Sequence, residues 1–241
     1  MEVHHHSHTA RKKWTHYFWE FFMLFLAVTA GFFVENQREH YIERKRAHQF
    51  AISLIEDLIA DTAELNGGVR ITKNVILRAD SLLNELDKPA VLQNDTLLQF
   101  LNSRLWAYSF YDPQLGTYNQ MKNSGSLRYF KKDLITYLNT YEKMANYIVK
   151  ISDKALDFRT NQFLPVILRI QNTRFIRALN KEIVYTGPVF SDKPGKLQIE
   201  EWYTYVSSIK NTYARIVMPM ESQAKHAVIL IGLLKKAYHL K

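Results

Sequence analysis

The sequence predicts an all-α protein: one N-terminal transmembrane helix that continues into a polar helical stalk, followed by an antiparallel helical bundle. Three observations support this. A long apolar run lies near the N-terminus, the 241 residues include only 8 Gly and 6 Pro, and apolar residues recur every three or four positions through most of the remaining chain. The predicted parts are a cytoplasmic tail rich in His and basic residues at 1–13, the transmembrane helix at 14–34, the stalk at 35–49 and the bundle at 50–241.

The tail carries histidines interrupted by Ser7. Clustered imidazoles bind zinc or nickel, so four side chains are weak candidates for metal ligands: His4, His5, His6 and His8. The competing interpretation, which we favour, is a solvated tail, because no acid or cysteine at a fixed distance completes a tetrahedral site. We therefore predict neither a cofactor nor a bound metal.

The apolar run from Tyr17 to Val34 has the length needed to cross a hydrocarbon layer of about 30 Å at about 1.5 Å per residue. It ends in the bulky sequence FFV, which lacks the small residues of a signal-peptidase site. Trp14, Tyr17 and Trp19 flank its start and are the expected anchors in the headgroup layer. We interpret the run as a retained span, in preference to a cleaved signal or the buried helix of a soluble domain.

Two pairs within this span carry functional hypotheses. Glu20 is an ionisable residue near one end, and His16 lies one turn earlier on the same face, so the two are expected to form an ionisable pair. In one hypothesis Glu20 from several chains lines an ion path; in the other, which we favour, it is an interfacial acid paired with His16, Arg11 or a neighbouring protein. Ala27 and Gly31 form a small-residue pair at which two helices can approach closely.

Residues 35–49 are predicted to continue the helix as a stalk, because they are polar on all sides and contain no Gly or Pro. Glu35 and Arg38 form an expected ion pair at a spacing of three. A dozen helical residues span about 18 Å.

The bundle is expected to contain helices separated by Gly, Pro and capping signals. The predicted elements are a helix from Phe50 broken by Gly67 and Gly68, a helix over Val69–Leu86, a helix capped at Asn94–Thr96, a short helix capped by Thr117 and closed at Gly125, a long helix over Lys131–Ile170 bent at Pro165, a surface loop at Tyr185–Lys196, and a final helix over Gln198–His239 kinked near Pro219. In the first helix, the inward stripe is expected to include Ile52, Ile55, Leu58, Ile59, Thr62 and Leu65.

Polar residues around the predicted turn at Gly125 are candidates for a pocket, although such residues more often satisfy the turn itself. They are Asn119, Gln120, Lys122, Asn123 and Arg128.

Charge divides unevenly along the chain. Residues 1–120 contain 12 Lys+Arg and 14 Asp+Glu, whereas residues 121–241 contain 20 and 9. A basic half fits an anionic partner such as lipid headgroups, an envelope polymer, nucleic acid or an acidic protein, while the simpler interpretation is a solvated surface of positive sign. We do not expect nucleic acid as a partner. The absence of cysteine excludes disulfides and thiolate chemistry.

The sequence predicts no enzyme. It contains none of the motifs GxxxxGK[ST], GxGxxG, HExxH and GxSxG, and no EF-hand loop. Its adjacent carboxylates, such as Glu56 and Asp57, point to different faces of a helix.

The segments YFWEFFMLFLAVTAGFFVENQREHYIERKR and GTYNQMKNSGSLR resemble a family of uncharacterised single-span membrane proteins of Bacteroidota, in which an N-terminal transmembrane helix precedes a helical domain of unknown function. The match is specific at the N-terminal segment and mainly architectural elsewhere. The resemblance implies a Gram-negative host and a periplasmic body, and assigns no activity.

Cations flank the span on both sides, but the cluster at Arg11–Lys13 lies directly against it. We therefore expect a cytoplasmic N-terminus and a periplasmic main domain on a single-pass protein of the bacterial inner membrane. The expected function is that of an envelope protein whose helical domain is a scaffold, an accessory subunit or a partner-binding module. The expected partners are membrane lipids and either further copies of the chain or other subunits of a membrane complex. The alternative is an ion- or proton-coupled oligomeric membrane component that uses Glu20, as in a stator or channel.

Overall fold

The structure is a computed structural model that describes residues 14–88, 95–105, 107–170 and 195–240. Every regular element among these residues is helical, so the predicted all-α class is confirmed. The elements are α1 (Trp14–Leu86), α2 (Asp95–Arg104), α3 (Gly116–Asn123), the 3-10 helix η2 (Ser126–Tyr129), α4 (Lys132–Phe158), the π-helical turn η3 (Arg159–Phe163), α5 (Leu164–Ile170) and α7 (Lys196–Tyr238). The histidine tail, Asn94 and nearly all of the predicted loop at 185–196 lie outside the described residues.

The chain divides into two compact units, residues 1–49 and residues 50–241, and helix α1 contributes to both. In the first unit, the described residues belong to α1 and nearly all of their side chains are exposed. The predicted pair of Glu35 and Arg38 is present there, with the Arg38 guanidinium 3.0 Å from the carboxylate.

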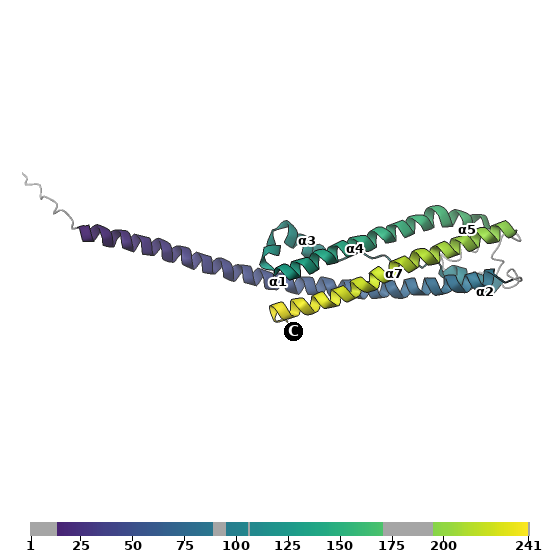
Figure 1. Cartoon of the computed structure of the whole chain (residues 1–241), viewed down its shortest axis with the longest axis horizontal. Coiled ribbons are helices and arrows are strands. Elements are labelled where there is room, and N and C mark those ends of the chain that lie inside the picture. The colour runs from purple at the N-terminus through teal and green to yellow at the C-terminus, as the bar shows by residue number, and fades with distance from the viewer. Residues whose placement is uncertain (1–13, 89–94, 106, 171–194, 241) are drawn as a thin grey trace, which may run out of the picture. The chain divides into compact units, whose positions relative to one another are not determined.

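The second unit is built on three long helices, which are α4, α7 and the part of α1 after residue 50 (Figure 1). Helix α7 runs antiparallel to both others, because α2 and the segment before α3 return the chain before α4 begins. One buried cluster joins Leu65 of α1 to Ile148 of α4 and Met220 of α7. A second cluster joins Leu82 of α1 to residues of α2, η3, α5 and α7, with Trp202 1% exposed at its centre.

The predicted break at Gly67 and Gly68 is wrong, because α1 continues through both residues to Leu86. Glycine in a helix interior costs about 1 kcal/mol relative to alanine, and packing of the flanking apolar face outweighs that cost. Close packing explains the glycine at position 68, since a Cβ there would lie 2.5 Å from Met220 Cε and 2.8 Å from Ser109 Oγ. A Cβ at Gly67 would contact nothing within 4 Å.

The buried face of α1 matches the predicted stripe in part. Ile55, Leu58 and Leu65 are buried as predicted, whereas Ile59 is 54% exposed and Ile52 is exposed as well. Leu54 and Asp61, which the prediction left out, are buried. The predicted and observed stripes share the helical period and are slightly rotated against each other, so the apolar pattern alone fits both. Only the packing partners, helices α4 and α7 and the segment before α3, decide which stripe is inward.

The predicted capping role of Thr117 is wrong, because α3 begins at Gly116 with Leu115 at the N-cap. The predicted closure at Gly125 is confirmed: α3 ends at Asn123, and Gly125 has a φ of 69°, a left-handed conformation that glycine adopts without strain. Ser126 then begins η2.

The long helix predicted over Lys131–Ile170 is present as the continuous run α4, η3 and α5. The π-turn at Arg159–Phe163 ends two residues before Pro165. Proline has no N–H to donate to the carbonyl one turn earlier in the helix, and the widened turn accommodates that missing donor. Helix α7 continues through Pro219, and its apolar C-terminal stretch packs in the bundle, with Ala227, Leu230 and Leu234 buried.

Candidate functional sites

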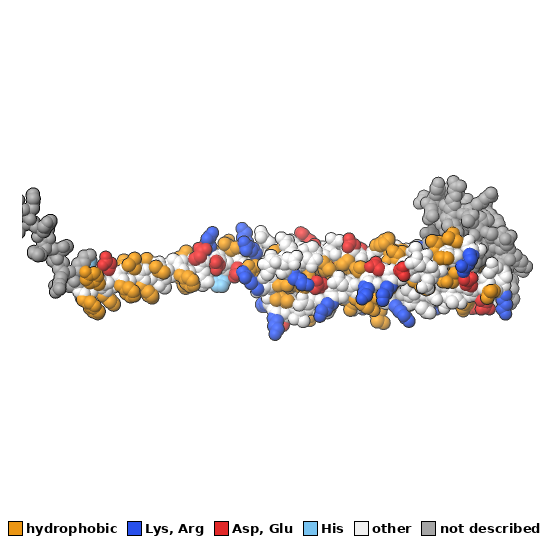
Figure 2. Space-filling view, turned by 90° about the horizontal axis from the view of Figure 1, so that it is seen from above, with side chains coloured by type: hydrophobic (Ala, Val, Ile, Leu, Met, Phe, Trp, Pro, Cys, Tyr) orange, Lys and Arg blue, Asp and Glu red, His pale blue; other side chains and the backbone are white. Residues whose placement is uncertain are grey.

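The first candidate site is the exposed apolar part of α1. Among the described residues, α1 is the one helix long and apolar enough to cross a membrane, with an 18-residue window of mean hydropathy 1.8 and 0% of that window buried. Phe21, Leu24 and Phe32 are each at least 65% exposed. A fully buried side chain of this kind gains about 1.5–3 kcal/mol over an exposed one, so water is a poor solvent for this segment. Apolar side chains stand exposed along the face of this segment that Figure 2 shows, and the segment is not part of a protein core in the described structure.

The predicted interfacial residues form an aromatic group at the start of this segment. The rings of Trp14 and Phe18 lie 6.2 Å apart, and those of His16 and Tyr17 lie 6.3 Å apart. Trp19 stands edge-on to Phe22 at 5.9 Å. Aromatic groups of this kind suit the headgroup layer of a bilayer.

The structure does not test the two pairs that are predicted within the span. Among the interactions of the described residues, none joins His16 to Glu20, so the ionisable pair stays a prediction. Ala27 and Gly31 are both exposed, and a Cβ on Gly31 would contact nothing within 4 Å. The helix surface there is open to a neighbouring helix, and whether one lies there stays a prediction.

The five polar residues predicted to line a pocket lie on and after α3. Lys122 Nζ donates to Glu142 of α4 at 3.0 Å and lies 5.7 Å from the Tyr118 ring. The Arg128 guanidinium lies 5.0 Å from the ring of Tyr129. The remaining three, Asn119, Gln120 and Asn123, are exposed. The five residues thus lie on an exposed surface, and none of them lines the hollow between Thr62 of α1 and Val228 of α7 or the small hollow between Leu54 of α1 and Leu138 of α4.

Sequence analysis missed a buried polar cluster centred on Asp61, which is 0% exposed. Its carboxylate accepts a hydrogen bond from the Tyr141 hydroxyl at 2.6 Å and a longer one from Tyr111 at 3.5 Å. The backbone N–H of Gln114 donates to the other oxygen at 2.7 Å. Burial raises the pKa of Asp61, against the lowering effect of these hydrogen bonds. Burial likewise raises the pKa of the Tyr141 hydroxyl, so it acts as a donor at neutral pH.

Asp61 belongs to an acidic face of α1 that holds the segment before α3. Asp57, Asp61 and Glu64 are spaced by four and three residues, which places them on one face of the helix. They accept backbone N–H groups from Thr117 at 3.3 Å, Gln114 at 2.7 Å and Asp112 at 2.8 Å, respectively. A non-helical segment must find partners for its backbone donors, and these carboxylates supply them. The role of this face is therefore structural.

The polar cluster extends to α7 through Gln223 and His226. Gln223 Nε2 donates to the Tyr141 carbonyl at 3.0 Å, and the His226 ring lies 5.6 Å from Tyr137 and 6.1 Å from Tyr141. Burial lowers the pKa of His226, so its ring is favoured in the neutral form. Gln223 Oε1 and His226 Nε2 are buried without a hydrogen-bond partner among the described residues. One signal in the sequence points to this cluster, because Asp61 is an acid in phase with Leu54, Leu58 and Leu65.

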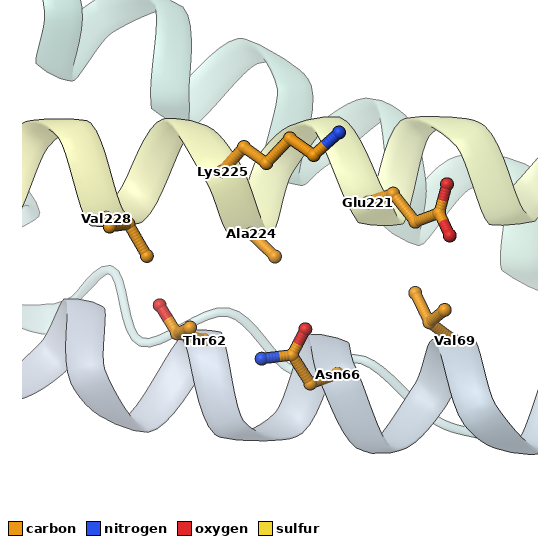
Figure 3. Close-up of a pocket in the computed structure, with 7 residues that line it drawn as sticks. All are labelled: Thr62, Asn66, Val69, Glu221, Ala224, Lys225 and Val228. Carbon is orange, nitrogen blue, oxygen red and sulfur yellow. The ribbon is translucent and has the colours of Figure 1, made fainter.

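A hollow of about 330 Å³ lies between α1 and α7 (Figure 3). Thr62, Asn66 and Val69 line it from α1, and Glu221, Ala224, Lys225 and Val228 line it from α7. In Figure 3 the Glu221 carboxylate points toward the Val69 side of this hollow. Glu221 is also paired with Lys73 at 2.6 Å, which joins the two helices. Four of the seven lining residues are polar or charged, so this hollow lacks the mainly apolar walls that are typical of a small-molecule pocket.

Comparisons of the chain with known protein families, with curated proteins and with solved structures found no match.

Proposed function

We propose that this chain is a membrane-anchored envelope protein whose helical unit acts as a scaffold, an accessory subunit or a partner-binding module. The observation that carries the proposal is the apolar window of α1, which is 0% buried by the rest of the described chain. A hydrocarbon layer is the environment that removes such a surface from water on all sides of a helix. The bundle formed by residues 50–241 then remains outside the membrane.

The proposed location is the inner membrane of a Gram-negative bacterium, with the N-terminus in the cytoplasm and the bundle in the periplasm. The basic residues 11–13 directly before the apolar run support this orientation. The proposed role is non-enzymatic and rests on assembly, either with further copies of the chain or within a membrane complex. Gly31 supports self-association, because a glycine in a helix is destabilising and no atom of the described chain uses its space.

Reporter fusions after Lys241 test the location. An alkaline phosphatase fusion is expected to be active and a green fluorescent protein fusion dark, and the full chain is expected to stay in the membrane fraction in alkaline carbonate. A bright fluorescent fusion would reject the orientation. Release of the chain by carbonate would reject the anchor itself.

The size of the purified protein in mild detergent tests the assembly. The full chain is expected to be larger than a monomer by light scattering, and Gly31→Leu is expected to reduce that size by blocking close approach of two spans. Glu20→Gln is the matched variant for the ion-coupled alternative, and we expect it to leave size and cellular function unchanged. A loss of function with unchanged size in Glu20→Gln would favour ion coupling over the proposed role.

A further inference from the structure

The bundle has a strongly basic end, which residues from η2, α4 and α7 form together. It comprises Arg128, Lys131, Lys132, Lys235 and Lys236. Contacts between the aromatic residues that accompany them fix these elements together: the rings of Phe130 and Tyr238 lie 5.2 Å apart, and the Tyr238 hydroxyl donates to the Tyr129 carbonyl at 3.5 Å. Figure 1 shows the start of α4 and the end of α7 at this same end of the bundle.

Positive charge predominates in the two segments that form this end. Residues 126–136 and 233–240 contain those five cations and one acid, Asp133. The N-terminus of α4 adds the positive end of a helix dipole there, and its N-cap Lys131 supplies no side-chain hydrogen bond to the free N–H groups. At the other end of the bundle, acids are paired with cations: Glu85 with Lys88, Glu201 with Arg169 and Asp80 with Lys210. The two ends therefore differ, because positive charge predominates at one of them only.

The basic end is also the end at which the chain enters the bundle. Leu54 and Leu58, near the start of the second unit, share a small hollow with Tyr118 of α3 and Leu138 of α4. Phe50 follows Val34 by 16 residues, which span about 24 Å as a helix and about 55 Å at full extension. The length of this tether thus limits how far the basic end can lie from the membrane that holds the anchor.

From the cluster of cations and the short tether, we propose that the basic end of the bundle docks on anionic phospholipid headgroups of the membrane in which the chain is anchored. The proposal rests on the anchor argued above. Clustered Lys and Arg side chains are attracted to an anionic bilayer surface, and the adjacent Tyr129 and Tyr238 have the amphipathic rings that suit this layer. The attraction acts within about 10 Å at moderate ionic strength, so docking depends on salt.

The test uses the full chain, which has no native cysteine, reconstituted in vesicles. A fluorophore is attached at Thr136→Cys, one turn into α4 from Lys132, and energy transfer to an acceptor on the lipid headgroups is measured. We expect strong transfer in vesicles with about a third phosphatidylglycerol, and much weaker transfer in pure phosphatidylcholine or in high salt. A label at Asn84→Cys, near the end of α1, is the positional control and is expected to show weak transfer in all vesicles.

Two matched triple variants test the residues. Lys131→Gln, Lys132→Gln and Lys236→Gln together remove three charges from the basic end and are expected to lower the docking equilibrium by on the order of 100-fold. Lys143→Gln, Lys150→Gln and Lys154→Gln remove the same charge from exposed positions along α4 and are expected to leave transfer nearly unchanged. Equal transfer in neutral and anionic vesicles, or equal loss in both triple variants, would overturn the proposal. A chain that fails to float with the vesicles would instead overturn the anchor.

Discussion

Helix α1 presents two regions with opposite surfaces. In residues 14–34 apolar side chains surround the helix and 0% of the apolar window is buried. In residues 50–86 the same helix buries a single stripe that includes Leu54, Leu65 and Leu82, and exposes polar groups on the other side. Both regions are continuous α-helix, so the difference lies in side-chain pattern alone. A helix that is apolar all round requires an apolar solvent, whereas a striped helix requires packing partners on one side.

The largest expected effect compares two leucines within the striped region of α1. Leu82 is 0% exposed and Leu77 is 64% exposed. Leu82→Ala is expected to lower the free energy of unfolding by about 2–5 kcal/mol, because it removes buried methyl groups and leaves a cavity. Leu77→Ala is expected to change it by less than about 0.5 kcal/mol. Chemical unfolding followed by circular dichroism checks both, and similar losses would contradict the assigned inward face.

The second effect concerns the acid within the buried stripe. Asp61→Asn is expected to cost about 1–3 kcal/mol, because the amide cannot accept all the hydrogen bonds that reach the carboxylate. The cost is expected to depend on pH. Since burial raises the pKa of Asp61 above the usual 3.8, the folded state binds the proton more tightly than the unfolded state.

The stability that protonation of Asp61 provides is therefore fully present below about pH 3.8 and is lost as the pH rises through the folded-state pKa. The difference in unfolding free energy between the native chain and Asp61→Asn is thus expected to be larger at acidic pH than at pH 7. Other carboxylates titrate in both proteins, so their effects cancel in this difference. A difference that stays constant or grows with pH would contradict the assigned environment.

A smaller effect distinguishes two neighbouring glycines in α1. Gly67→Ala is expected to stabilise the bundle by up to about 1 kcal/mol, since alanine favours the helix and its Cβ contacts nothing within 4 Å. Gly68→Ala is expected to gain less or to destabilise, because its Cβ displaces Met220 Cε and Ser109 Oγ. Thermal unfolding of both variants measures the two changes in stability. A larger gain at Gly68 than at Gly67 would be inconsistent with the packing of α7 on α1.

The smallest effect is expected at the ion pair of Lys73 and Glu221, which joins α1 to α7 on the surface. The hydrogen bond and charge of Lys73 lower the pKa of Glu221, so the pair contributes above pH 4.5 and its contribution fades as the pH falls through the folded-state pKa. Glu221→Gln is expected to reduce the unfolding temperature slightly at low salt and not at high salt. A large loss that persists in high salt would show that the pair is not a screened surface contact.

Periodicity and composition predicted the helical class, the candidate span and most helix ends, because those features depend on local side-chain chemistry. The continuity of α1 through Gly67 and Gly68 was not predictable in the same way, since the packing that outweighs two glycines comes from distant segments such as the one around Met220. Thr117 is a plausible cap by residue type, yet its N–H donates to Asp57, sixty residues away.

The candidate sites also differ in whether they depend on local sequence or on contacts between distant segments. The apolar anchor can be predicted from the sequence, because a helix surrounded by lipid is apolar on every face and one continuous segment shows this. The Asp61 cluster is assembled from α1, α4, α7 and the segment before α3, and no short motif connects Asp61 with Tyr141 or Gln223. An acid in phase with buried leucines is the one local sign of it.

Collision accessibility along α1 measures the difference between its two regions directly. Single cysteines placed at successive positions of 17–34 and 50–77 in this cysteine-free chain carry spin labels in reconstituted vesicles, and their contact with oxygen and with an aqueous nickel chelate is recorded. We expect high oxygen and low nickel contact at every position from about 20 to 32, whatever the helix face, and a 3.6-residue oscillation of nickel contact from 50 to 77. Nickel contact that oscillates with the helical period in the first region, or is high throughout it, would contradict the account of this segment as a lipid-embedded anchor.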